Sequence, residues 1–111
     1  MAALVTPSAR AHAIVESSEP AANAVVAPGD LRVRVRFGSR IDAARSRLTL
    51  IAPDGRRTTL ALDQSDVPGM LTATAQVGAR GRYTLQWQVL SVDGHVTRGD
   101  IPFRVDGDAA R

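Results

Sequence analysis

Residues 83–95 read YTLQWQVLSVDGH, and this stretch decides the fold. Apolar and polar side chains alternate from position 83 to position 89, which is the period of a β-strand with one buried face. The stretch holds the only Trp and the only Tyr of the chain, so we expect this strand to cross the middle of the core. The alternation stops at Asp93-Gly94-His95, where Asp-Gly is typical of a turn. A carboxylate and an imidazole two residues apart at the end of a rigid strand are the first indication of a metal site.

The same alternation, bounded by turn residues, recurs along the chain. Residues 31–37 give the cleanest case, with three Arg predicted to face outward as a solvated face rather than as an anion-binding or partner-binding surface. Pro53-Asp54-Gly55-Arg56 predicts a hairpin turn. We expect a loop or short irregular strand at 21–28 and a connection with one turn of helix at 38–44. The remaining predicted strands are 12–20, 47–52, 57–62, 70–77 and 96–105, with Pro102 at an edge or a bulge.

About seven short strands with turns between them predict an all-β fold, an antiparallel β-sandwich of the immunoglobulin-like type. Tyr83 lies early in the penultimate strand, where such folds place a Tyr that ties down a corner. A length of 111 residues indicates one domain, which we place at 12–105. Residues 106–111 are expected to be a tail or linker.

Residues 1–11 differ in character from the rest. Ala9-Arg10-Ala11 has the small-x-small form of a signal-peptidase site, so this segment is predicted to be the remnant of a signal peptide or a disordered N-terminal extension. Cleavage after Ala11 would make His12 the first residue of an exported, periplasmic protein.

The composition excludes several kinds of chemistry. The chain has no Cys, which rules out disulfides, thiolate metal sites and a Cys nucleophile. Its net charge of +3 comes from Arg residues spread along the chain, so we do not expect a nucleic-acid partner. No nucleophile elbow, catalytic carboxylate pair or phosphate-binding Gly-rich loop is present, and we expect no enzymatic activity.

His12, Asp93 and His95 form the candidate metal site. A lone exposed His is usually a surface residue, and Asp-Gly is usually only a turn. His12 as a first residue, however, would offer both its α-amine and its ring Nδ1, and the amine titrates near pH 7.7–8.0, where a metal can displace its proton. With the His95 ring and an Asp93 oxygen, the set of three nitrogens and one oxygen suits tetragonal Cu(II) and offers nothing soft for Cu(I).

These residues resemble the CopC-type copper-resistance domains of the bacterial periplasm. The resemblance begins with His-Ala-x-x-x-x-Ser-x-Pro at residues 12–20, and continues with a strand that ends at Phe37. It ends with Gly-x-Tyr-x-x-x-Trp-x-Val-x-Ser-x-Asp-Gly-His at residues 81–95, followed by Gly99 and an alternating strand that contains Phe103.

The resemblance implies a Greek-key β-barrel or sandwich, similar to cupredoxins, that binds Cu(II) through the amine and ring of His12, the ring of His95 and the carboxylate of Asp93. It also implies a monomer that sequesters copper or delivers it to a membrane copper transporter of the CopD type. Some members carry a Met-rich Cu(I) site, but this chain has only Met1 and Met70, so we expect a Cu(II)-only member. While residues 1–11 remain attached, the His12 amine is a peptide nitrogen and the chelate cannot form.

Two other functions remain open from the residues. One is a metal-free β-sandwich that acts as an interaction domain. The other is a copper oxygenase, because an N-terminal His chelate is also used by copper monooxygenases; an Asp ligand would fill the coordination plane that such an enzyme leaves open for oxygen.

Overall fold

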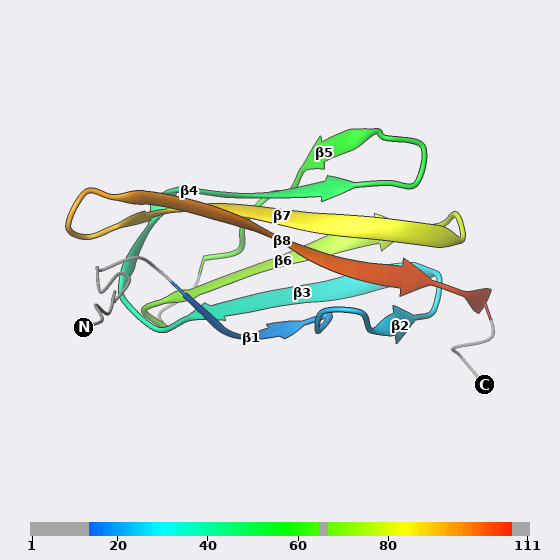
Figure 1. The fold of residues 1–111 in the computed structure, drawn as a ribbon, viewed down its shortest axis with the longest axis horizontal. Helices are drawn as coiled ribbons and strands as arrows, with labels where there is room; N and C mark the ends of the chain where they lie inside the picture. The colour runs from blue at the N-terminus through cyan, green and yellow to red at the C-terminus, as the bar shows by residue number, and fades with distance from the viewer. Residues whose placement is uncertain (1–13, 65–66, 108–111) are drawn as a thin grey trace, which may run out of the picture.

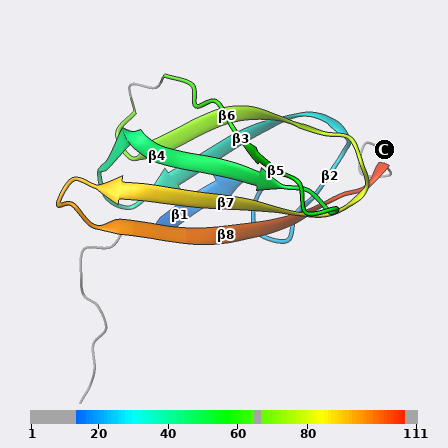
Figure 2. The same cartoon turned by 90° about the horizontal axis from the view of Figure 1, so that it is seen from above.

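Two β-sheets pack face to face in the computed structural model, which describes residues 14–64 and 67–107 (Figures 1 and 2). The smaller sheet has the order β1-β3-β6 and the larger has the order β2-β8-β7-β4-β5. No helix long and apolar enough to cross a membrane occurs in these residues. The fold is the predicted immunoglobulin-like β-sandwich. Its strands are β1 (Val15–Glu19), β2 (Val25–Val26), β3 (Gly29–Phe37), β4 (Ile41–Ile51), β5 (Arg57–Thr59), β6 (Met70–Val77), β7 (Gly81–Ser91) and β8 (Val96–Val105).

The antiparallel pair β7 and β8 forms the centre of the larger sheet. Every second residue of β7 from Tyr83 to Ser91 is buried, as the alternation predicts. Trp87 is 7% exposed and meets Phe37 of the opposite sheet edge to face, with ring centroids 5.1 Å apart. Tyr83 stacks on Phe103 of β8, and its hydroxyl donates a hydrogen bond to the Ala79 carbonyl at 2.8 Å. The predicted role of Tyr83 in tying down a corner is thereby confirmed.

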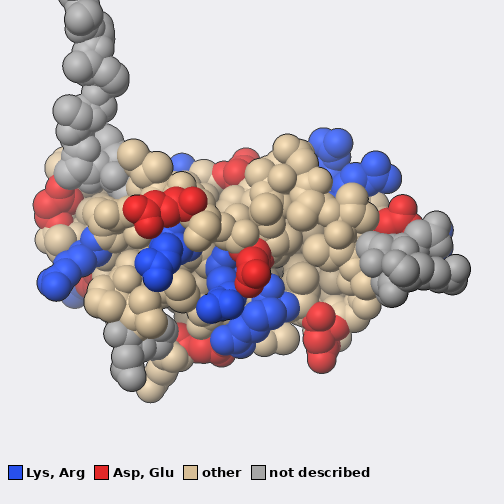
Figure 3. Space-filling model, turned by 90° about the horizontal axis from the view of Figure 1, so that it is seen from below, with Lys and Arg blue, Asp and Glu red and all other residues tan. Residues whose placement is uncertain are grey.

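The smaller sheet confirms the predicted orientation of β3. Val33, Val35 and Phe37 are buried, and the three Arg residues between and before them are exposed. Arg32 pairs with Asp63 at 3.0 Å and Arg34 pairs with Glu19 at 3.5 Å. Arg and acidic side chains therefore lie side by side on the outer face of this sheet, as Figure 3 shows from below.

The expected turn of helix in 38–44 is wrong, because β4 already begins at Ile41. Asp42 faces Leu90 of β7 and Arg47 faces Gln88, so β4 takes five residue steps where β7 takes two. The extra residues form a bulge, which breaks the period of two and hides the strand from pattern analysis. Ser46 fixes this bulge, since its hydroxyl donates to the Asp42 carbonyl and accepts from the Leu90 N–H.

The strand predicted at 57–62 is shorter than expected, because β5 ends at Thr59. Leu60 still donates to the Leu48 carbonyl of β4, but the chain then leaves the larger sheet, and the Asp63 N–H donates to the Thr72 carbonyl of β6 in the smaller sheet. The irregular segment at 21–28 contains the two-residue strand β2, which pairs parallel with the end of β8. β2 brings the number of described strands to eight, against about seven predicted.

The two ends of the described chain lie at opposite ends of the sandwich. The chain enters β1 near the end that carries the turn between β7 and β8, and β8 finishes at the other end (Figures 1 and 2). Pro102 lies outward on β8, and its carbonyl accepts from the Asn23 N–H, on the side away from β7. The missing N–H of Pro102 therefore falls on the side of β8 away from β7, next to the point where β2 pairs with Arg104 and Val105, so β8 is not the edge strand that Pro102 was predicted to mark.

Candidate metal centre

A tight turn between β7 and β8 carries two of the three predicted site residues. The Ser91 N–H donates to the His95 carbonyl at 2.8 Å, and the Gly94 N–H donates to the Ser91 carbonyl at 2.9 Å. Gly94 has a φ of 94°, which a residue without Cβ adopts at little cost. Asp-Gly therefore forms a turn, as predicted, and it is anchored on the two central strands of the larger sheet.

Asp93 and His95 are in contact on this turn. Asp93 Oδ1 accepts from the backbone N–H of His95 at 3.2 Å and lies 3.2 Å from Nδ1 of the ring. The His95 side chain is 61% exposed and that of Asp93 is 40% exposed. The backbone N–H of His95, together with its ring, lowers the pKa of the Asp93 carboxyl below the ordinary value. At neutral pH the turn therefore presents an ionised carboxylate beside an imidazole.

His12 lies outside the described residues, so its place in the site stays a prediction. Within 14–64 and 67–107, no three His, Asp or Glu side chains gather into a group that could hold a metal ion. The described chain begins at Ile14, whose carbonyl accepts from the Gly38 N–H at 2.8 Å, near the same end of the sandwich as the turn (Figures 1 and 2). Two residues of extended chain span up to about 7 Å.

Two buried hydroxyl groups lie near this turn: Ser91, which belongs to the motif at residues 81–95, and Thr97, which sequence reasoning did not single out. Ser91 Oγ and Thr97 Oγ1 are enclosed and have no hydrogen-bond partner among the described atoms. Ser91 continues the alternation of buried positions on β7, and Thr97 lies opposite Val89 on β8. Buried polar atoms generally have a partner, so these hydroxyls mark a place where an ordered water or another group fits.

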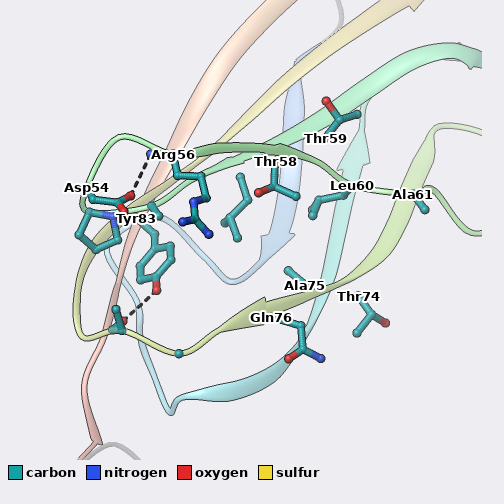
Figure 4. A pocket seen from close by; sticks show the side chains of 15 residues that line it. Asp54, Arg56, Thr58, Thr59, Leu60, Ala61, Thr74, Ala75, Gln76 and Tyr83 are labelled. Carbon is teal, nitrogen blue, oxygen red and sulfur yellow. Dashed lines mark hydrogen bonds between the residues drawn. The ribbon is translucent and has the colours of Figure 1, made fainter.

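A cavity at the other end of the molecule has no His in its lining. Its volume is about 640 Å³, and it opens between the β4–β5 turn and the β6–β7 turn (Figure 4). Leu50, Leu60 and Ala75 line it together with Tyr83, whose hydroxyl is already bonded to Ala79. It offers no set of metal ligands.

Comparison with known proteins identifies the family. The model of the CopC domain matches residues 15–106. The protein YobA of Escherichia coli strain K12 is 33% identical over 105 residues, covering 92% of this chain and 85% of YobA. The crystal structure of CopC from Methylosinus trichosporium OB3b superposes with a TM-score of 0.74 at 32% identity, over 86% of this chain and 94% of that one.

The crystal structure of PcoC, a methionine-rich copper resistance protein from Escherichia coli, has the same fold, with a TM-score of 0.64 at 22% identity over 86% of this chain and all of PcoC. The family model and YobA each cover most of the chain, and YobA shares a third of its residues. The chain therefore belongs to the CopC domain family.

Proposed function

We propose that this protein is an exported Cu(II)-binding protein of copper resistance, which sequesters copper or passes it to a membrane copper transporter of the CopD type. Membership of the CopC family supports the copper-resistance role. The observation that carries the proposal is the contact between Asp93 and His95 on a turn fixed by two central strands. A rigid pair of oxygen and nitrogen donors is a starting point for a metal site.

The donor set favours Cu(II). His95 would offer one ring nitrogen to the metal. His12, once it is the first residue, would add its amine and its ring Nδ1, and Asp93 would add an oxygen. The chain has no Cys and only two Met, so soft ligands for Cu(I) are scarce.

The test compares protein that begins at Met1 with protein that begins at His12. Each form is titrated with Cu(II) and followed by electron paramagnetic resonance. We expect stoichiometric binding with a nitrogen-rich tetragonal spectrum only in the form that begins at His12. Equal and weak binding in both forms would remove the N-terminal chelate and favour a metal-free interaction domain.

A matched control separates the amine from the ring. In protein that begins at residue 12, His12→Ala keeps a free amine but removes one imidazole nitrogen, and we expect the spectrum to lose one nitrogen ligand. His95→Ala removes the ligand on the turn and is expected to weaken binding as well. Hydrogen peroxide formed on reduction of the copper-loaded protein would favour the oxygenase alternative instead.

A further inference from the structure

A cavity on the outer face of the larger sheet gathers three Arg side chains. It measures about 230 Å³ and is lined by Arg47, Thr49, Arg57, Gln86, Gln88 and Arg98, which we call the arginine cavity. These residues come from all four neighbouring strands β5, β4, β7 and β8. Neither Asp93 nor His95 lines it, so the arginine cavity is separate from the proposed copper site.

The strand register explains why these side chains converge. Arg47 and Arg98 both lie opposite Gln88, one on each side of β7. They are therefore two strand spacings apart, about 10 Å, with the Gln88 side chain between them. Arg57 approaches from β5, and its Nη2 donates to Gln86 Oε1 at 2.6 Å. Three guanidinium groups thus surround the amide side chains of Gln86 and Gln88 on the outer face of the sheet.

The charge of this cavity is not balanced by carboxylates. In the part of the chain that the structure describes, no ion pair involves Arg47, Arg57 or Arg98. The nearest carboxylate in the register is that of Asp100, which accepts from Gln86 Nε2 at 3.2 Å. Three guanidinium charges and one carboxylate leave a net charge of about +2 around the cavity.

The opposite face of the sandwich is arranged differently. There, Arg32 and Arg34 of β3 each have an acidic partner, Asp63 and Glu19, and the surface alternates in charge (Figure 3). Arg side chains that only protect a sheet from aggregation can be paired with acidic side chains, as on β3, and they do not need to surround a cavity. The arginine cavity, whose Arg side chains have no acidic partner among the described residues, is therefore the surface that resembles an anion site.

We infer that the arginine cavity binds a phosphate group. Guanidinium groups that approach from three strands match a ligand with three peripheral oxygens, whereas a carboxylate has two oxygens and is satisfied by one guanidinium fork. A phosphate monoester dianion also matches the net charge of about +2. Gln88 and the Thr49 hydroxyl are further hydrogen-bond donors in the lining.

The test titrates the copper-free chain with inorganic phosphate and phenyl phosphate, by calorimetry and by the NMR shift of the Gln88 side-chain amide. We expect saturable 1:1 binding that weakens as ionic strength rises. Arg47→Gln/Arg98→Gln is expected to lower the affinity at least about tenfold, because charge-assisted hydrogen bonds are lost from two sides.

Arg32→Gln/Arg34→Gln is the matched control, because it removes the same charge from the other face. We expect it to change the affinity less than about threefold, since the cavity is intact and distant surface charges are screened. All four substituted side chains are exposed, so both variants are expected to fold, and thermal unfolding checks this.

Vesicles of phosphatidylcholine, with and without phosphatidic acid, whose headgroup is a phosphate monoester, distinguish the source of the phosphate. Binding of the soluble phosphates with the expected variant pattern supports the inference and assigns a soluble ligand. Binding only to vesicles with phosphatidic acid, with the same variant pattern, supports it and assigns a lipid headgroup. Binding to neither probe, or an equal loss in both double variants, overturns it.

Discussion

Gly99→Ala is expected to destabilise the fold through one contact. Gly99 lies directly opposite Trp87 in the β7–β8 pair. A Cβ added there would lie 2.5 Å from Cζ2 and 2.8 Å from Cε2 of the Trp87 ring. The ring cannot retreat easily, because Trp87 is 7% exposed and packs against Phe37 at 5.1 Å. Overpacking of this kind costs about 1–3 kcal/mol, which lowers the Tm of a domain of this size by about 4–24 °C.

The assay is urea and thermal unfolding followed by the fluorescence of Trp87, the single Trp of the chain. Gly78→Ala is the control, because an added Cβ there meets nothing within 4 Å. We expect it to change the free energy of unfolding by less than about 1 kcal/mol. The reasoning is refuted if Gly99→Ala is as stable as the parent protein, or if Gly78→Ala loses as much stability.

The remaining predictions concern the turn and the corner. In protein that begins at residue 12, Asp93→Asn should lower Cu(II) affinity about 10- to 100-fold in a chelator competition, and an unchanged affinity would remove Asp93 from the site. Because the His95 N–H and ring lower the pKa of the Asp93 carboxyl, NMR should show this carboxyl titrating below its ordinary value of 3.8, and a midpoint above 3.8 would contradict the contact. The stability that the contact contributes is therefore present at neutral pH and is lost only as the pH falls through the lowered pKa. Gly94→Ala should cost about 1–3 kcal/mol in urea unfolding, because φ is 94° there. Tyr83→Phe should cost about 0.5–1.5 kcal/mol in the same assay, through the lost hydrogen bond to Ala79; no change would mean that the bond is replaced by water.

Strands that keep a strict period of two were predictable from sequence. β3 and β7 each bury one face, and their alternation alone predicts which side chains face the core. The start of β4 was not predictable, because the bulge between Asp42 and Arg47 shifts the alternation out of phase. The early end of β5 was also missed, since it depends on Asp63 pairing with β6 in the other sheet.

The same distinction applies to the sites. Asp93 and His95 are close in sequence, so the turn itself brings them together and local pattern analysis predicts their contact. The arginine cavity combines Arg47, Arg57 and Arg98 from three strands, and only the register of the sheet places them over one hollow. His12 lies outside the described residues, and its role stays a prediction.

The opposite placement of the β7–β8 turn and the end of β8 determines how the molecule can be oriented on a support. A fusion partner, affinity tag or sensor surface joined after residue 107 is held at the far end of the sandwich from Asp93 and His95. A protein immobilised in this way would present the turn to the solution, whereas attachment before Ile14 would crowd it. C-terminal attachment is therefore the arrangement of choice for surface-based copper measurements.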